Sequence, residues 1–346
     1  MAAPRRRVRM HEVAARAGVS TSTVSHVING TRHVAPDTRD AVLQAVAALD
    51  YAITPHPQTA AGRRTIGLVI TGASNPYNGE LIQGVEGEAT RAGFGLFLCD
   101  SHDDPRREAE AVRGLITHNA EAVVIAPTPE WEAQALPMLR KSERPFVLVD
   151  RLSSARCDQV SAESESVSAT LVEHLIDLGH RRIGMLSGLP GLSTSIERVR
   201  GYQRALSDAG IPIDPALIAC GESRATSARA ATLQLMRGNA APTALFSANN
   251  AMTIGALQAL GELGLRIPDD LAVVAFDDFE WAAAMTPALT AVAQPFHAMG
   301  AQAVQLLLRR LQDPLAPRRV VRLPTEIAHR HSCGCVAPRP RTAGVP

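Results

Sequence analysis

Short polar side chains line the outward face of a helix that the sequence predicts from Thr21 onward. They are Thr21, Ser22, Ser25 and His26. Hydroxyl and imidazole groups donate and accept hydrogen bonds, so this face can meet base edges in a DNA major groove, where every base pair shows a distinct pattern. The alternative is an ordinary pair of core helices whose polar face is simply solvated.

A second group of polar residues follows the ends of predicted strands. It comprises Asn75 and Tyr77, Asp150 and Arg151, Thr194 and Arg198, and Asp277 and Asp278. Binding sites of open α/β sheets collect at the carboxyl ends of strands. Carboxylates and guanidinium groups facing one cavity can bind vicinal hydroxyls bidentately, and a ring such as Tyr77, Phe279 or Trp281 offers an apolar sugar face a platform. The alternative is a set of solvated loops or ion pairs.

The first 50 residues contain the helices that position the outward-facing groups. Met10, Val13, Ala14 and Ala17 give a short helix one apolar face, and Gly18 ends it. Ser20 is placed to cap a second helix, whose inward stripe is Val24, Val27 and Ile28. A third amphipathic run over 38–49 packs Val42, Ala45, Val46 and Leu49 behind them. The pattern predicts a helix-turn-helix.

From Ile66 onward, short apolar runs alternate with amphipathic helices. The first series is IGLVIT, 80–91, GLFLCD, 107–117, AVVIAP, 132–139 and FVLVD; the second is 167–178, IGMLSG, 198–209, LIAC, 228–236, ALFSA, 254–263 and LAVVAFDD. Alternation of this kind predicts a parallel sheet covered on both faces. Two series in succession predict two similar α/β lobes with a cleft between them, followed by an amphipathic helix over 297–311.

Length and charge agree with a multidomain protein that has one basic end. The chain has 346 residues, of which 46% are hydrophobic, so two or three domains are expected. Residues 1–64 hold nine Lys and Arg against four Asp and Glu, or +5, so the net charge of +1 leaves −4 for the remainder. A basic end suits a polyanionic partner, and Arg5, Arg6, Arg7 and Arg9 either touch phosphates or form a solvated tail.

Several function classes are not expected. GMLSG is not the G-x-S-x-G of a nucleophile elbow, and the sequence has no phosphate-binding G-x-x-x-x-G-K-[ST] loop. The C-terminal segment that contains His329, His331, Cys333 and Cys335 is too short to enclose zinc, so we expect no metal site. We also expect no cofactor and no catalytic residues.

The cysteines and the hydropathy predict a cytoplasmic protein that does not enter a membrane. The five cysteines are scattered without a C-x-x-C pair, which is typical of reduced thiols; they are Cys99, Cys157, Cys220, Cys333 and Cys335. The start lacks the apolar stretch of a secretory signal, and no run approaches the roughly 20 apolar residues that span a membrane.

The N-terminal motif resembles a known family. VAARAGVS followed by TSTVSHVINGTRHVA is similar to the DNA-reading headpiece of the LacI/PurR family, nearest to its purine-responsive members. That resemblance implies that Thr21, Ser22 and His26 face bases and that Arg32 is a further base or backbone contact. The candidate DNA-binding set is therefore Thr21, Ser22, Ser25, His26, Asn29 and Arg32.

The resemblance continues through the body. HLIDLGHRRIGMLSG, FDDFEWA, MTPALTAVAQP and LPTEIAHRHS stand where the family has like strings, in an effector domain shared with periplasmic sugar-binding proteins. It implies crossings between the lobes near Ser161, Val292 and Leu323, and it supports Arg198 and Asp277 most firmly as effector contacts. The candidate effector set is Asn75, Tyr77, Arg151, Thr194, Arg198, Asn250, Asp277 and Trp281.

This sequence departs from the family pattern at three places. The linker is about two residues short and has no Leu to wedge into a minor groove, so hinge-mediated kinking is not implied. Arg151 replaces a Trp of purine-responsive members, which favours a polyol over a stacked purine. Asn249-Asn250 and Glu163-Ser164 stand where many sugar-responsive members have Asn-Asp and Asp-Asn, so the pocket differs from theirs.

The sequence thus predicts a helix-turn-helix headpiece (1–50), a linker (51–65), a two-lobed effector-binding and dimerisation domain of the type I periplasmic-binding-protein class (66–335) and a tail (336–346). We expect a cytoplasmic homodimeric repressor that binds palindromic double-stranded operator DNA and is controlled by a sugar or sugar-derived effector. The alternatives are a purine-responsive repressor, a sugar-metabolising enzyme, and an architectural DNA-binding protein without a ligand.

Overall fold

The computed structural model describes residue 8, residues 10–29, 34–49 and 51, and residues 64–73, 75–238 and 241–335. Contacts divide the chain into two compact units, 1–64 and 65–346. Most of the predicted linker, the whole predicted tail, and Arg5, Arg6, Arg7, Arg9 and Arg32 lie outside the described residues.

The first unit contains three helices around one small core. They are α1 (Met10–Ala17), α2 (Thr21–Asn29) and α3 (Pro36–Ala48). Its buried residues are Val13, Ala14, Val24, Val42 and Ala45, with Val27, Ile28, Val46 and Leu49 packed against them. The predicted apolar stripes are therefore confirmed, and α3 begins two residues before the predicted start because Pro36 needs no backbone donor in the first turn.

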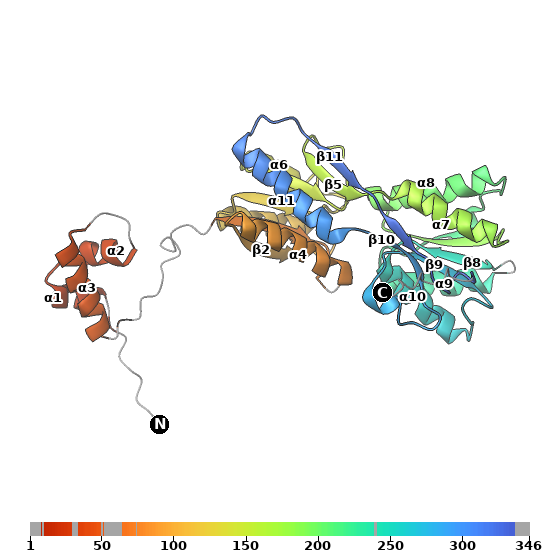
Figure 1. Cartoon of the computed structure of the whole chain (residues 1–346), viewed down its shortest axis with the longest axis horizontal. Helices are drawn as coiled ribbons and strands as arrows, with labels where there is room; N and C mark the ends of the chain where they lie inside the picture. The colour runs from red at the N-terminus through yellow and green to blue at the C-terminus, as the bar shows by residue number, and fades with distance from the viewer. Residues whose placement is uncertain are drawn as a thin grey trace, which may run out of the picture. The chain divides into compact units, whose positions relative to one another are not determined.

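The second unit contains two six-stranded sheets (Figure 1). The first consists of β1 (Thr65–Ile70), β2 (Gly95–Asp100), β3 (Ala122–Ile125), β4 (Phe146–Val149), β5 (Asp158–Ala162) and β11 (Val320–Leu323), in the order β11-β5-β4-β3-β1-β2, all parallel. The second consists of β6 (Ile183–Ser187), β7 (Ile218–Cys220), β8 (Ala244–Ser247), β9 (Ala272–Phe276), β10 (Thr290–Ala293) and β12 (Glu326–Ala328), in the order β12-β10-β9-β8-β6-β7. Only β12 pairs antiparallel among these described strands.

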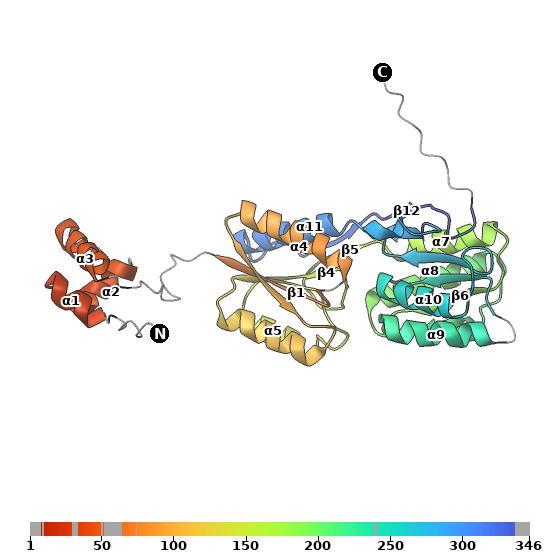
Figure 2. The same cartoon turned by 90° about the horizontal axis from the view of Figure 1, so that it is seen from below.

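Helices cover both faces of each sheet (Figure 2). The first lobe carries α4 (Pro76–Arg91) and α11 (Phe296–Gln312) on one face, with α5 (Pro105–Thr117) and α6 (Ala135–Lys141) on the other. The second carries α7 (Glu165–Asp177), α8 (Ser193–Asp208), α9 (Ala225–Arg237) and α10 (Asn250–Glu262), with short 3₁₀ turns at Pro215–Leu217 and Glu280–Ala282. Strand β1 shows why both faces need cover, since Ile66, Leu68 and Ile70 enter one core and Val69 the other.

The chain crosses between the lobes three times. It crosses after β5, after β10 and after β11, because in each case the next strand or helix belongs to the other lobe. These places lie within a few residues of the predicted Ser161, Val292 and Leu323. Helix α11 therefore belongs to the first lobe although it follows a strand of the second. The backbones of α11 and α4 are in close contact. A Cβ atom added at Gly84 would lie only 2.0 Å from the carbonyl oxygen of His297, so this contact requires glycine.

Several helices begin earlier in the structure than the sequence predicts. Helix α4 begins at Pro76 and α8 at Ser193, whereas apolar periodicity predicted starts at 80 and 198. The first turns of these helices are polar or contain Pro, so their residues show no apolar periodicity from which a helix could be predicted. Within the part of the chain that the structure describes, no helix is both long and apolar enough to cross a membrane.

Candidate functional site

The turn between α1 and α2 is built as the sequence predicts. Gly18 has φ +69°, a left-handed conformation that ends α1 at no steric cost. The Oγ atom of Ser20 accepts a hydrogen bond from the backbone N–H of Thr23 at 3.1 Å, which caps α2. This cap and the buried Val24 fix which side of α2 faces away from the core.

The predicted base-contacting residues lie on α2. Thr21 and Ser22 are exposed, and Ser25 and His26 are half-buried. The Ser22 hydroxyl lies 2.7 Å from the Ser20 hydroxyl, so the first turn of α2 presents an ordered group of donors and acceptors. Asn29 is the last residue of α2, but its side chain lies outside the described atoms.

The second unit holds a small cavity of about 30 Å³ lined by residues of both lobes. Its lining is Tyr77, Asp150, Arg151, Gly188, Leu192, Thr194, Ser195, Arg198, Ser223, Ala248, Asn249, Asp277 and Gln294. The space accommodates a water molecule or two, so a larger ligand requires the lining to open. A hydrogen bond from Asn250 Nδ2 to Asn75 Oδ1 joins the lobes at its edge.

Two aspartates occupy equivalent positions in the two lobes. Asp150 follows β4 and Asp277 follows β9, the strands that stand third in each sheet order. Their φ values are +68° and +74°, a left-handed conformation that Asp tolerates better than most residues but that still costs free energy. The two carboxylates thus follow matched strand ends in the two lobes.

Arg151 is anchored from the first lobe. Both terminal nitrogens of its guanidinium donate to the carboxylate of Asp103, and Nη1 also donates to the carbonyl oxygen of Pro127 at 3.1 Å. Burial lowers the pKa of Arg151, but Asp103, together with Tyr77 and Asp150, outweighs this effect and raises the pKa above its ordinary value. Arg151 is therefore a fixed positive charge in the cavity wall.

Arg198 supplies the second positive charge, from α8. Its Nη1 donates to the carbonyl oxygen of Ala248 at 2.6 Å, and its guanidinium carbon lies 3.6 Å from the centre of the Phe276 ring. The side chain is buried, yet its Nε has no hydrogen-bond partner within the described residues. A buried donor left unpaired is costly, so this atom is suited to a ligand oxygen.

Asp277 is held in place by two donors. Its Oδ1 accepts from Gln294 Nε2 at 2.5 Å and its Oδ2 accepts from the backbone N–H of Asn250 at 3.2 Å. Each oxygen keeps a second lone pair for a ligand hydroxyl. Asn250 is buried as well, and its Oδ1 has no partner among the described atoms.

Burial shifts the pKa of the other acidic groups. Desolvation raises the pKa of Asp150, although Arg151 and Arg198 oppose the shift, and desolvation also raises the pKa of Tyr77. In the first lobe, the buried Glu108 of α5 accepts hydrogen bonds from the N–H and hydroxyl of Thr128 at 2.7 and 2.9 Å. Burial raises the pKa of Glu108 to about 7.

Most of the predicted effector set gathers around this cavity. Tyr77, Arg151, Thr194, Arg198 and Asp277 are in its lining, while Asn75 and Asn250 bridge the lobes beside it. Thr194 and Arg198 are four residues apart in α8 and so share one helix face.

The structure places Trp281 elsewhere and adds residues that the sequence did not single out. Trp281 is 40% exposed and is not in the lining, and its ring centre lies 3.8 Å from that of Phe279 with the ring planes tilted by 39°. The polar additions are Ser195, Ser223 and Gln294. Gln294 follows β10 at a crossing between lobes, a position that could have indicated it.

The aromatic rings near the cavity are already engaged. Tyr77 stacks on Phe296 with ring centres 4.5 Å apart and planes at 16°, and the Phe276 ring is covered by Arg198. No pair of rings in the described lining is arranged to hold a flat heterocycle between two faces. The polar groups instead suit a ligand rich in hydroxyls.

Comparisons with known proteins agree with the architecture of both units. A model of bacterial regulatory proteins of the lacI family matches residues 9–53, and a model of periplasmic binding protein-like domains matches residues 172–333. The chain is 34% identical over 325 residues to the HTH-type transcriptional repressor PurR of Aliivibrio salmonicida (strain LFI1238), covering 93% of this chain and 97% of that one.

Two solved structures are similar over nearly the whole chain. One is a lac repressor dimer bound to operator and the anti-inducer ONPF, with a TM-score of 0.72, 27% identity, and coverage of 95% of this chain and 99% of that one. The other is the transcriptional regulator CelR in complex with cellobiose, with a TM-score of 0.70, 29% identity, and coverage of 94% and 100%.

Proposed function

This chain belongs to the LacI family of bacterial regulatory proteins, and we propose that its effector is a sugar or sugar-derived metabolite held between the two lobes. Membership makes the chain a DNA-binding transcriptional regulator of a family of repressors, with a small-molecule effector domain, and not an enzyme. The proposal concerns which ligand controls it, which residues bind that ligand, and which residues read DNA.

The observation that carries the effector proposal is the buried, unpaired Nε of Arg198 in a cavity wall that also holds Asp277 and Arg151. A guanidinium group donates hydrogen bonds to the hydroxyl oxygens of a sugar, and a carboxylate accepts hydrogen bonds from the same hydroxyl groups. Together they can bind two neighbouring hydroxyls. Arg198, Asp277, Arg151, Thr194 and Tyr77 would contact the ligand. Asn75 and Asn250 would contact it once the lobes part, and Trp281 would not.

A purine remains the alternative effector, and the engaged rings argue against it. A flat base needs free ring faces or an equivalent apolar slot, whereas Tyr77 and Phe276 already have one face covered. The similarity to the cellobiose complex of CelR adds support for a sugar.

For DNA, we propose that Thr21, Ser22, Ser25 and His26 meet base edges, with Asn29 and Arg32 as further contacts. Two headpieces of a homodimer would then read the two halves of a palindromic operator. Exposed Phe97 and Leu98 on the edge strand β2 offer apolar surface for self-association. A repressor of bacterial genes acts in the cytoplasm, where the DNA lies.

The test is a thermal-shift series on the full chain, followed by operator binding. The panel contains cellobiose, pentoses, hexoses, sugar acids, sugar phosphates and purines. A ligand at 100 times its Kd adds about 2.7 kcal/mol to the free energy of unfolding, enough to move the melting temperature visibly. The proposal expects a sugar to stabilise the protein and to change its affinity for operator. Stabilisation by a purine base alone would overturn it.

A further inference from the structure

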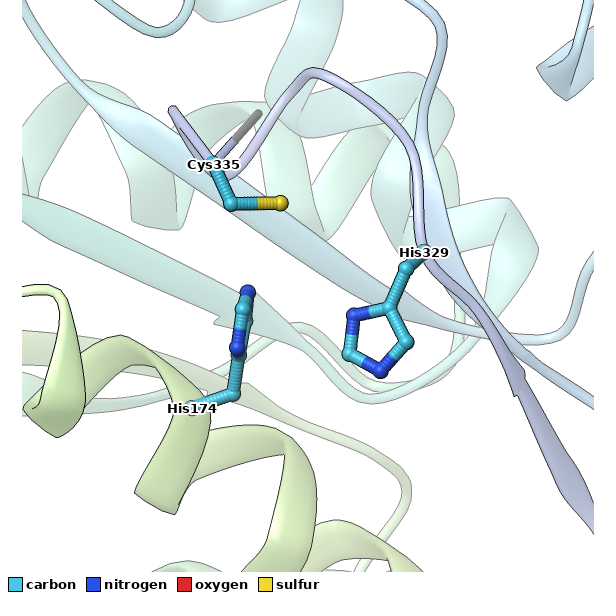
Figure 3. A group of neighbouring side chains, drawn as sticks. All are labelled: His174, His329 and Cys335. Atoms are coloured by element: carbon cyan, nitrogen blue, oxygen red, sulfur yellow. The ribbon is translucent and has the colours of Figure 1, made fainter. Parts of the chain in front are cut away.

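Two imidazoles and two thiols meet on the second lobe, outside the effector cavity. His174 comes from α7, and His329, Cys333 and Cys335 come from the segment that follows β12. The side chains of His174, His329 and Cys335 point toward a common space (Figure 3), and their potential ligand atoms all lie within 4.8 Å of one another.

Cys333 adds a fourth donor at the edge of this group. Its Sγ lies 3.4 Å from Nε2 of His174 and 3.0 Å from Sγ of Cys335. His174 and Cys333 are 159 positions apart in the sequence, so the fold brings them together and the sequence spacing does not. For that reason the C-terminal segment alone was not expected to bind metal.

The donor set and its spacing suit a tetrahedral metal ion. Zn²⁺ bonds to Cys sulfur at about 2.3 Å and to His nitrogen at about 2.0–2.1 Å, so ligand atoms of a tetrahedral site lie about 3.4–3.8 Å apart. The ligand atoms of His174, His329 and Cys335 lie within 4.8 Å of one another, and Cys333 lies 3.4 Å from His174 and 3.0 Å from Cys335, so rotation of the exposed His329 is needed to close the site. Two nitrogens with two sulfurs are a ligand set that favours zinc over Mg²⁺ or Ca²⁺, which prefer oxygen.

We propose that His174, His329, Cys333 and Cys335 bind one zinc-type ion that fastens the C-terminal segment to α7. Each thiol releases its proton to solvent as its sulfur joins the metal, and both imidazoles bind in the neutral form. The segment is already held by Ser332, whose Oγ donates to the carbonyl oxygen of Val273 at 2.6 Å. The ion would add a second fastening beside β12, the strand that follows the third crossing between lobes.

The site is independent of the proposed effector. None of its four ligands lines the cavity that contains Arg198 and Asp277. Failure of the zinc site would therefore leave the sugar proposal intact, and the reverse also holds. The competing interpretation is a redox pair, because Cys333 and Cys335 are close enough to invite oxidation to a disulfide.

The experiment loads the full chain, reduced and stripped of metal by a chelator, with Co²⁺ as the probe. Wild-type protein should bind one equivalent with a thiolate charge-transfer band and tetrahedral visible bands, and added Zn²⁺ should abolish both. His329→Ala removes an exposed ligand and should weaken binding at least about tenfold, as should Cys335→Ser. Two matched controls should bind as wild type: His331→Ala removes an exposed imidazole of the same segment, and Cys220→Ser removes an exposed thiol that lies elsewhere.

Two further measurements separate metal binding from misfolding and from thiol oxidation. Without metal, the circular dichroism spectra and melting temperatures of the variants should match those of wild type. Zn²⁺ should raise the melting temperature of wild type and of both controls, but not that of His329→Ala or Cys335→Ser. If His329→Ala and Cys335→Ser bind Co²⁺ as tightly as wild type, or if reduced wild type takes up no Co²⁺, the proposal is wrong. A loss of two hydrogens on mild oxidation together with no metal uptake would assign Cys333 and Cys335 to a redox pair instead.

Discussion

Replacing Asp277 with Asn should weaken the effector without unfolding its site. Asp277 is 2% exposed, and its two oxygens accept from Gln294 Nε2 and from the N–H of Asn250. Asn has the same shape, its Oδ1 can keep the bond from Asn250, and Gln294 can turn its amide to present an oxygen to the new NH₂. The substitution therefore removes a charge while preserving the packing.

The expected loss follows from the two lone pairs that Asp277 keeps for a ligand. A hydrogen bond to a charged group contributes about 1.5–3 kcal/mol and one between neutral groups about 0.5–1.5 kcal/mol. The difference is about 1 kcal/mol for each ligand hydroxyl, or about 2 kcal/mol for two. The effector Kd of Asp277→Asn should then rise about 30-fold.

Isothermal titration calorimetry measures this change, with the first sugar that stabilises wild-type protein as the ligand. The control is Asp278→Asn, which alters the adjacent carboxylate; that carboxylate pairs with Arg330 and is not in the cavity lining. Operator affinity without effector should be unchanged in both variants. A Kd for Asp277→Asn within about threefold of wild type, or an equal loss in Asp278→Asn, would refute the assignment of Asp277 as a ligand contact.

Three more expectations concern DNA, pH and packing. His26→Ala should cost about 1–3 kcal/mol of operator binding and relax preference at one base pair in a panel of operator variants; an unchanged preference would count against a base contact. Burial raises the pKa of Glu108 from 4.5 to about 7, so between those values the folded protein holds a proton that the unfolded chain has released, and stability falls as pH rises. Glu108→Gln should flatten that fall in urea titrations from about pH 5 to about pH 8, and an equally steep fall would assign it to other groups. Gly300→Ala puts a Cβ 2.4 Å from the carbonyl oxygen of Leu81 and should cost about 1–3 kcal/mol, whereas Gly87→Ala meets nothing within 4 Å and should not destabilise; equal thermal melts would contradict the close α4–α11 packing.

The sequence alone predicts the elements of this fold well where the signal is local. The helical spacing of apolar residues and the cap at Ser20 predict the positions of α1 and α2. Short apolar runs that alternate with helices predict the strands of both lobes. Helix starts such as Pro76 and Ser193 were missed because polar first turns carry no period. The edges of elements are decided by backbone hydrogen bonds that the side-chain pattern does not record.

The residues of the candidate sites also differ in how far the sequence predicts them. Charged residues at strand ends, such as Arg151 and Asp277, are predictable because parallel strands present their carboxyl ends at one edge. Asp103, which fixes Arg151, is not, because it comes from a different loop and acts only through contact in the fold. The meeting of His174 with Cys335 is unpredictable for the same reason, since two segments approach only when the second lobe is assembled.

The small cavity between the lobes has a consequence for control of DNA binding. Because it is lined from both lobes and bridged by Asn75 and Asn250, we expect an effector bound there to replace contacts between the lobes. The first lobe begins at Thr65, directly after the linker to the headpiece, so any rotation of that lobe moves the point from which the headpiece extends. If effector and operator each favour a particular lobe arrangement, their coupling must be reciprocal: operator should change the affinity for effector by the same factor as effector changes the affinity for operator.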